Sequence, residues 1–234
     1  STVIVFALAL APVGFGWRPV TVRAADVGWA VSSLLVSEVQ TGGASASDEF
    51  VEIANQGAAA VDLNGLEVVY ATSSGSTVTR KATWAAPTTL EPGRRVLIAN
   101  AGGIFAAGAD LTYSGGFAAT GGAVALRVVG GMVVDAIGWG DAASGFVEGS
   151  AAPAPASGSS LERLPGGTLG NTVDTNLNLT DWIVQALPSP QGLSASPVPV
   201  TTPTPTPTPN PTPNPTPAPT PAATPNPTPN PTPT

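Results

Sequence analysis

The sequence contains no cysteine, no histidine and only one lysine among its 234 residues. The first two absences exclude disulfides, thiolate or imidazole metal sites, and any Ser-His or Cys-His nucleophile pair. Charged residues make up 10 % of the chain, and its formal net charge is −7 at pH 7. Because proteins bind the phosphate backbone largely through Lys and Arg, this balance argues against autonomous binding to nucleic acid.

An apolar run opens the chain, from Thr2 to Ala11. Its length matches the apolar region of a signal peptide and falls short of a membrane-spanning helix. Val22-Arg23-Ala24 has small or short residues where a cleavage site needs them. We therefore expect residues 1–24 to be a signal peptide whose true start is missing, because neither an initiator Met nor a basic region precedes the run. A core element or an uncleaved membrane anchor are the alternatives.

Proline gathers at the other end of the chain. Of the 26 prolines, 17 lie in residues 196–234, mostly in Thr-Pro and Asn-Pro repeats. Alternate prolines remove backbone donors and favour polyproline II, and threonine supplies no apolar core. We expect a disordered, polyproline II linker here, and we expect the protein to continue beyond it.

The middle of the chain, residues 31–195, is long enough for one domain. Short runs of β-branched and apolar residues alternate there with Gly, Asn, Ser and Pro clusters, and no segment keeps a helical apolar period over three turns. This pattern predicts an all-β antiparallel sandwich or barrel. The expected strands are 34–39, 49–54, 65–71, 77–84, 95–99, 123–129, 132–139, 159–163 and 182–185.

Eight short motifs follow one another in this middle domain. They are LVSEVQ (35–40), DEFVEIAN (48–55), VDLNGL (61–66), LEPGRRVLIAN (90–100), GGAVAL (121–126), VDAIGWG (134–140), SLER (160–163) and DTNLN (174–178). In this order they resemble the lamin tail domain of secreted bacterial proteins, over residues 33–192. The resemblance implies an immunoglobulin-like antiparallel β-sandwich without catalytic residues at these positions. Leu66 departs from it, because the family commonly has Trp there.

Four acidic residues, Glu38, Asp48, Glu49 and Glu52, are candidates for neighbouring positions on adjacent strands. An acid–base pair or a divalent-cation site is one interpretation. The other, which we favour, is a solvated strand face with edge charges. Strand alternation places Glu52 on one face together with Phe50.

The segment that carries Asp174, Asn176, Asn178 and Asp181 has the spacing of the first ligands of a calcium loop. It lacks the glycine and the final glutamate of that loop. Asp and Asn side chains also cap turns, which explains the segment without a metal, so Ca²⁺ is only a weak candidate. Asn178-Leu179-Thr180 additionally fits a glycosylation sequon.

Three tryptophans, Trp84, Trp139 and Trp182, have two interpretations. They form either a sugar-stacking platform or part of the core, where an indole buries a large area; we favour the core. Arg163 is expected to pair with a strand carboxylate such as Asp135 or Asp62.

These observations contain no catalytic site, cofactor site or phosphate loop, so we predict that the protein is not an enzyme. We expect a secreted or cell-surface interaction or scaffolding module on a Pro-Thr stalk. Its partner would be a protein or glycan of the envelope or exterior. We expect a monomer that binds no nucleic acid and, apart from the signal segment, no membrane. The alternatives are an accessory domain of a larger secreted nuclease or phosphatase, and a carbohydrate-binding module.

Overall fold

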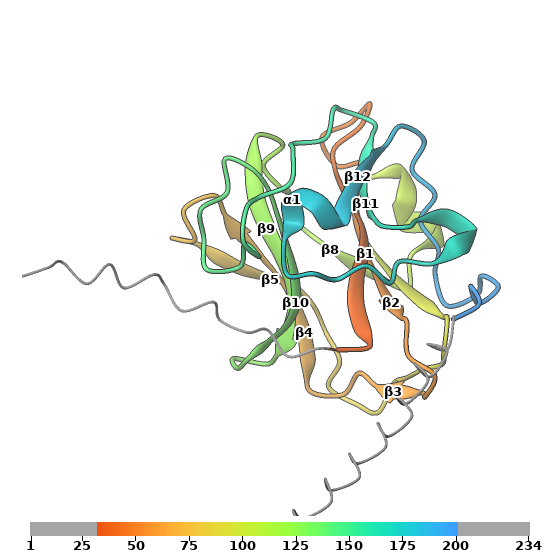
Figure 1. The fold of residues 1–234 in the computed structure, drawn as a ribbon. Helices are drawn as coiled ribbons and strands as arrows, with labels where there is room; N and C mark the ends of the chain where they lie inside the picture. The colour runs from red at the N-terminus through yellow and green to blue at the C-terminus, as the bar shows by residue number, and fades with distance from the viewer. Residues whose placement is uncertain (1–31, 201–234) are drawn as a thin grey trace, which may run out of the picture. The chain divides into compact units, whose positions relative to one another are not determined.

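The computed structural model of the chain describes residues 32–200 (Figure 1). The signal peptide expected for residues 1–24 and most of the linker expected for residues 196–234 lie outside the described residues. Within residues 32–200, no helix combines the length and the apolar character that crossing a membrane would need.

Strands form most of the regular structure. They are β1 (Leu34–Thr41), β2 (Glu49–Asn55), β3 (Val61–Asp62), β4 (Leu66–Thr72), β5 (Val78–Thr83), β6 (Thr89–Leu90), β7 (Arg95–Asn100), β8 (Leu111–Tyr113), β9 (Gly121–Val128), β10 (Val133–Gly140), β11 (Ser160–Arg163) and β12 (Trp182–Gln185). Two 3₁₀ helices, η1 (Ile104–Gly108) and η2 (Gly167–Leu169), and a one-turn helix, α1 (Asn178–Asp181), complete the elements.

Two sheets face each other as a sandwich. The six-stranded sheet has the order β12-β11-β1-β2-β7-β8, and the four-stranded sheet has the order β10-β9-β4-β5. Neighbouring strands in both sheets are antiparallel except for β7 and β8, which are parallel. The predicted all-β, immunoglobulin-like antiparallel sandwich is therefore confirmed.

Side chains from both sheets meet in one apolar core. Val51 and Ile53 of β2 enter it from the six-stranded sheet, and Leu126 and Ile137 enter it from the four-stranded sheet. All four are fully buried. The period of two along each strand places them there, because every second side chain points toward the facing sheet.

The outer face of the six-stranded sheet is covered as well. Phe50 of β2 points away from the main core and packs edge-on against Phe105 of η1, with ring centroids 4.8 Å apart. Every residue of β1 and β2 is consequently buried. Both faces of these two strands are therefore buried, whereas a strand at the surface of a sandwich has one buried face and one solvent-exposed face.

Residues 189–198, here called the C-terminal strap, contribute to this cover. The Arg94 guanidinium donates hydrogen bonds to two carbonyls of the strap. The N–H of Val198 donates to the carbonyl of Gly93 at 3.0 Å, and the Val198 side chain is buried. Ordered packing thus continues past residue 195, where the sequence placed the end of the domain.

Each of the nine predicted strands has a counterpart whose ends differ by a few residues. In the turn between β9 and β10, Gly130 has φ 63° and the N–H of Val128 donates to Met132 O at 2.9 Å. The strands that the sequence did not predict, β3, β6 and β8, have only two or three residues each, too few to form a recognisable apolar run.

Candidate functional site

The interpretation of Glu38, Asp48, Glu49 and Glu52 as a solvated strand face is wrong. All four residues are only 1–2 % exposed, because both faces of β1 and β2 are covered. They do not form one site either. Glu38 and Glu52 are direct cross-strand neighbours. Asp48 instead accepts hydrogen bonds from the N–H of Ser45 in a loop and from the N–H of Ile104, the first residue of η1.

Three glutamates stand side by side on the six-stranded sheet. Glu52, Glu38 and Glu162 are partners in register across β2, β1 and β11, and we call them the glutamate row. Arg95 Nε lies 2.8 Å from Glu52 Oε1 as an ion-pair partner. Burial, reinforced by the neighbouring carboxylates, raises the pKa of Glu38 to about 8 and the pKa of Glu52 to about 7.

Protein donors occupy the glutamate row. Ser160 Oγ donates to Glu38 at 2.5 Å, and the strap N–H groups of Ser189 and Gln191 donate to Glu38 at 3.3 Å and Glu52 at 2.6 Å. These donors satisfy the carboxylates without an external ligand. The row therefore fastens the strap to the sheet instead of facing a substrate.

Arg163 and Asp135 form a buried ion pair between the two sheets. Arg163 Nη2 lies 2.8 Å from both carboxylate oxygens of Asp135, which confirms one of the two predicted partners. Asp62, the other predicted partner, instead accepts hydrogen bonds from the N–H groups of Asn64 and Thr88 in an exposed turn.

Two further carboxylates lie beside this pair. Oxygens of Asp135, Glu148 and Asp174 lie within 4.8 Å of one another, and Arg163 Nη1 is 3.5 Å from Asp174. Burial and the charge of Asp135 raise the pKa of Glu148. Because both oxygens of Asp135 already accept from Arg163, the guanidinium supplies the positive charge that a metal ion would supply.

The calcium candidates do not come together as a ligand set. Asn178 is fully buried, and its Oδ1 accepts from the N–H groups of Gly138 at 2.8 Å and Glu148 at 3.1 Å. Asp181, also fully buried, accepts from the N–H and the hydroxyl of Thr175. Asn176 occupies a turn at φ 56°.

Asp174 belongs to the carboxylate group beside Arg163, so the predicted loop serves as turn and packing structure. The buried Nδ2 of Asn178 donates to Ala136 O at 3.1 Å, which leaves this sequon asparagine out of reach in the folded chain.

The tryptophans fill the sandwich. Trp84, Trp139 and Trp182 are 6 %, 0 % and 5 % exposed and all belong to the main core. The indole N–H of Trp139 donates to Ala118 O at 3.0 Å, and the Arg163 guanidinium lies 4.7 Å from the ring centroid of Trp182. A sugar-stacking platform built from these three residues is therefore wrong, and their interpretation as core residues is correct.

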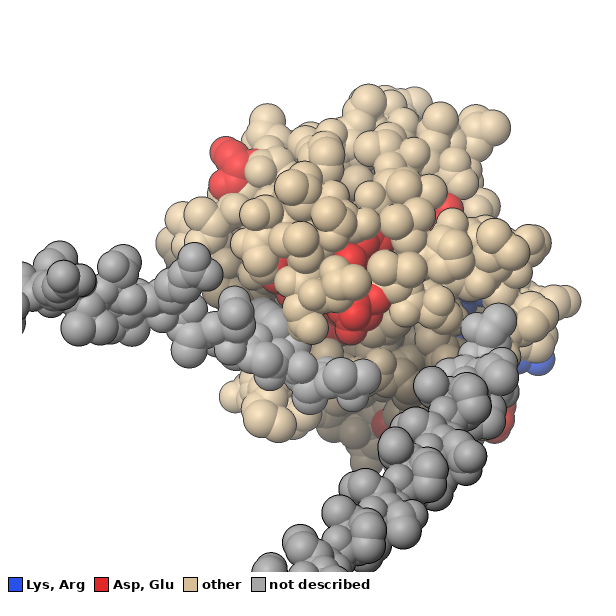
Figure 2. Space-filling model, viewed as in Figure 1, with Lys and Arg blue, Asp and Glu red and all other residues tan. Residues whose placement is uncertain are grey.

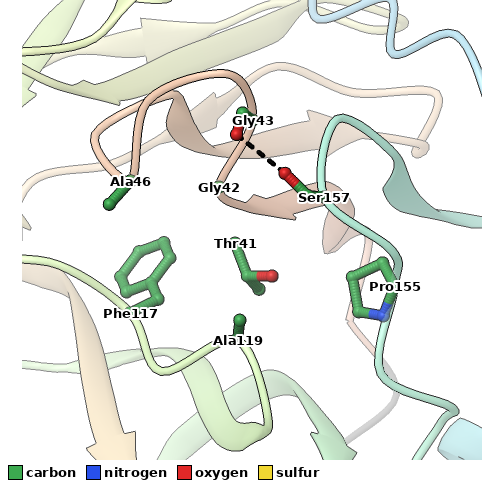
Figure 3. Close-up of a pocket in the computed structure, with 8 residues that line it drawn as sticks. All are labelled: Thr41, Gly42, Gly43, Ala46, Phe117, Ala119, Pro155 and Ser157. Carbon is green, nitrogen blue, oxygen red and sulfur yellow. Dashed lines mark hydrogen bonds between the residues drawn. The ribbon is translucent and has the colours of Figure 1, made fainter.

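A pocket of about 300 Å³ opens at the end of the sandwich where β1 and β2 are joined (Figure 3). Ser157 Oγ donates to Gly43 O at 2.7 Å and ties two of its lining loops together. Phe117 forms one side of it. The lining residues are Thr41, Gly42, Gly43, Ala46, Phe117, Ala119, Pro155 and Ser157.

Sequence reasoning missed Lys81, the single lysine of the chain, because an isolated basic residue in a short strand suggests only a solvated side chain. Lys81 is 7 % exposed, and its Nζ lies 4.8 Å from the ring centroid of Tyr113 and 5.3 Å from that of Phe117. Its uniqueness in the composition was the signal available for finding it.

Acidic and basic side chains are distributed unevenly on the face of the molecule shown in Figure 2. On the face shown in Figure 2, acidic atoms gather near the centre, and the basic atoms in view lie toward one margin. This distribution offers no basic stripe on that face for a phosphate backbone.

The fold and these sites define an immunoglobulin-like β-domain. Residues 29–141 match the family model described as Lamin Tail Domain. Among solved structures, the chain is similar to a DUF4876 family protein from Bacteroides thetaiotaomicron VPI-5482, with 13 % identity and a TM-score of 0.49 over 68 % of this chain and 72 % of that one. A comparison with curated proteins finds no match. The family match spans β1 to β10, while β11, β12 and the strap follow it.

Proposed function

We propose that the chain is a secreted or cell-surface, non-catalytic interaction module, of the lamin tail type found in secreted bacterial proteins. In this proposal, the edge strand β12 docks an extended, uncharged segment of a protein partner. The observation that carries the proposal is the contrast between β12 and the other sheet edges.

Three of the four edges of the two sheets are protected. Strand β10 is covered by Ala152, which bridges to Trp139 and exchanges two backbone hydrogen bonds of 2.8 Å with the strand. Strand β5 carries the exposed charge of Arg80, and β8 is only three residues long. Covering, charging and shortening are the usual means by which proteins prevent an edge from pairing with another chain.

Among the described residues, β11 alone pairs with β12, and β12 itself contains no charged residue. Ile183 is 39 % and Val184 is 50 % exposed, and the next residues lead to Leu187 at 82 %. The side of β12 that faces away from β11 therefore exposes backbone N–H and C=O groups, flanked by the side chains of Ile183 and Val184. An extended peptide can pair with such an edge as an additional strand.

Other features support the remaining parts of the proposal. Glu38 and Glu52 of the glutamate row accept hydrogen bonds from protein donors, which favours a binding role for the chain over acid–base chemistry on a substrate. The apolar N-terminal run and the Thr-Pro repeats favour a position outside the cell. Burial of the three core tryptophans removes the feature that favoured a glycan, so we propose a protein partner.

The test is capture from proteins of the source cells' envelope by the immobilised full chain. The Val184→Lys variant places a charge on the β12 edge, and we expect it to lose the captured partner. The matched control is Val78→Lys, which adds the same charge to the β5 edge, where Val78 is 40 % exposed. That variant should retain the partner.

Retention of the partner by Val184→Lys would overturn the role of β12, and so would equal loss from both variants. Failure of the unaltered chain to retain any protein would count against the interaction module itself. Melting curves of both variants establish that the sandwich is intact.

A further inference from the structure

A lysine, an asparagine and a glutamate converge between the two sheets. Lys81 lies on β5 of the four-stranded sheet, and Asn100 ends β7 and Glu49 begins β2 in the six-stranded sheet. We propose that Lys81 and Asn100 join in an intramolecular isopeptide bond, with Glu49 moving the protons. The bond would covalently cross-link the two sheets.

The attacking nitrogen, Lys81 Nζ, and the leaving nitrogen, Asn100 Nδ2, donate hydrogen bonds to the same carbonyl oxygen. Lys81 Nζ and Asn100 Nδ2 each lie 3.2 Å from the carbonyl oxygen of Gly115. Both residues are 7 % exposed, so water has little access to either of them. Their shared acceptor places the lysine amine and the side-chain amide of Asn100 at the same point between the sheets.

The surroundings of Lys81 favour the neutral amine that must act as the nucleophile. Its Nζ lies 4.8 Å, 5.3 Å and 5.6 Å from the ring centroids of Tyr113, Phe117 and Tyr70. Burial among these groups lowers the pKa of Lys81, although the charge of Glu49 opposes the shift. The other hydrogen bonds that Nζ donates, to Ser114 O and Gly116 O, are long at 3.4 Å and 3.5 Å.

Glu49 is placed to transfer protons. Its Oε2 accepts from Asn100 Nδ2, the leaving nitrogen, at 2.9 Å, and its Oε1 accepts from the N–H of Phe117 at 2.6 Å. Burial raises the pKa of Glu49, which makes its carboxylate a better proton acceptor. On the other side of the amide, the N–H of Gly102 donates to Asn100 Oδ1 at 3.1 Å, where negative charge develops during attack.

The step balances without another reagent. The Lys81 ammonium gives a proton to the Glu49 carboxylate, and the nitrogen lone pair attacks Cγ of Asn100. The new Nζ–Cγ bond forms and the Cγ–Nδ2 bond breaks. The two protons that Nζ gives up pass through Glu49 to Nδ2, which leaves as an ammonium ion. Nothing is oxidised or reduced, and Glu49 ends as it began.

The mass of the full, denatured chain tests the proposal directly. We expect it to be lower than the mass of the linear sequence by one ammonia. Trypsin should fail to cleave after Lys81, so that the peptide 81–94 remains joined to the peptide 96–127. An unshifted mass together with a free peptide 82–94 would overturn the proposal. Lys81 would then stabilise the fold through its hydrogen bonds and aromatic contacts alone.

Variants separate the three roles. Lys81→Arg and Glu49→Gln should each keep the linear mass, whereas Asn100→Asp should lose water instead of ammonia if it reacts. The matched control combines Lys81→Arg with Arg80→Lys, which moves the amine to the neighbouring, exposed position on β5, and it should remain linear.

Continued cross-linking in Glu49→Gln would overturn the role of Glu49. If that variant does not fold, as judged by circular dichroism, the mass of the unaltered chain and the Lys81→Arg variant still decide whether the bond exists.

Discussion

Arg163 and Asp135 clamp the backbone of a third strand between them. Asp135 Oδ2 accepts from the N–H of Val36 at 2.5 Å, and Arg163 Nε donates to the carbonyl of Val36 at 2.9 Å. The register of β1 against β2 shifts between Val36 and Glu38, where a bulge takes backbone groups out of the ladder. The ion pair thus satisfies the polar groups that the bulge sets free.

The Asp135→Asn substitution should therefore be strongly destabilising. It removes the negative charge and leaves the fully buried Arg163 guanidinium without its main partner. Loss of one member of a buried pair costs about 3–5 kcal/mol of the free energy of unfolding. Urea denaturation followed by circular dichroism measures the change. Glu91→Gln, at an exposed position, is the control. A similar small change in both variants would show that Arg163 finds other compensation.

The glutamate row predicts that stability depends on pH. The pKa of Glu38 is about 8 in the folded chain against an ordinary value of 4.5, so the folded state binds more protons than the unfolded state between these pH values. The free energy of unfolding should consequently fall as the pH rises from 4.5 through 8. The raised pKa of Glu52, about 7, acts in the same direction. Melting temperatures across this range measure the slope.

The Glu38→Gln variant isolates one part of that slope. Glu38 Oε1 accepts both hydrogen bonds, from Ser160 and from Ser189, and the amide oxygen of glutamine can accept them as well. We expect a flatter dependence on pH and higher stability than the unaltered chain on the alkaline side. An unchanged slope would mean that other groups titrate.

Two glycines near the ends of η1 predict opposite responses to the same substitution. A Cβ on Gly103 would lie 1.9 Å from the backbone oxygen of Ser47, whereas a Cβ on Gly108 would meet nothing within 4 Å. Gly103→Ala should lower the melting temperature clearly. Gly108→Ala should be neutral or stabilise by up to about 1 kcal/mol, since it restricts the unfolded chain. Equal effects would contradict the close approach at Gly103.

Calcium is expected to leave the melting temperature unchanged. The carboxylate of Asp181 and the Oδ1 atom of Asn178 accept hydrogen bonds from groups of the same chain. The carboxylate of Asp135 accepts from Arg163. Thermal unfolding with calcium chloride, with a chelator, and with magnesium chloride at equal ionic strength provides the measurement. A rise specific to calcium would show that a ligand set forms after all.

The sequence was most informative where the pattern of apolar and polar residues within one strand decides which side chains face the core. Val51 and Ile53 alternate with Phe50 and Glu52, and this alternation predicts β2 and its core-facing side chains correctly. The pairing of Arg163 with Asp135 was also predictable, because a charge in an otherwise apolar strand needs a partner.

What the sequence could not provide was the cover over the outer face. Alternation shows that Glu52 faces away from the core, but the strap that buries it comes from residues more than a hundred positions later. The same limit applies to Lys81, whose neighbours Glu49 and Asn100 belong to the opposite sheet. Such placements follow from the packing of whole elements, for which short sequence windows contain no signal.

The attachment of the strap has a mechanical consequence. Val198 is held to Gly93, and the preceding carbonyls are held to Arg94, so a pull on the chain beyond residue 198 loads these few contacts one after another. Such a sequence of single contacts peels at low force. The long ladder between β1 and β2 would bear tension only after the strap has come away. Detachment of the strap would therefore take up tension on the chain before the sheets of the sandwich are loaded.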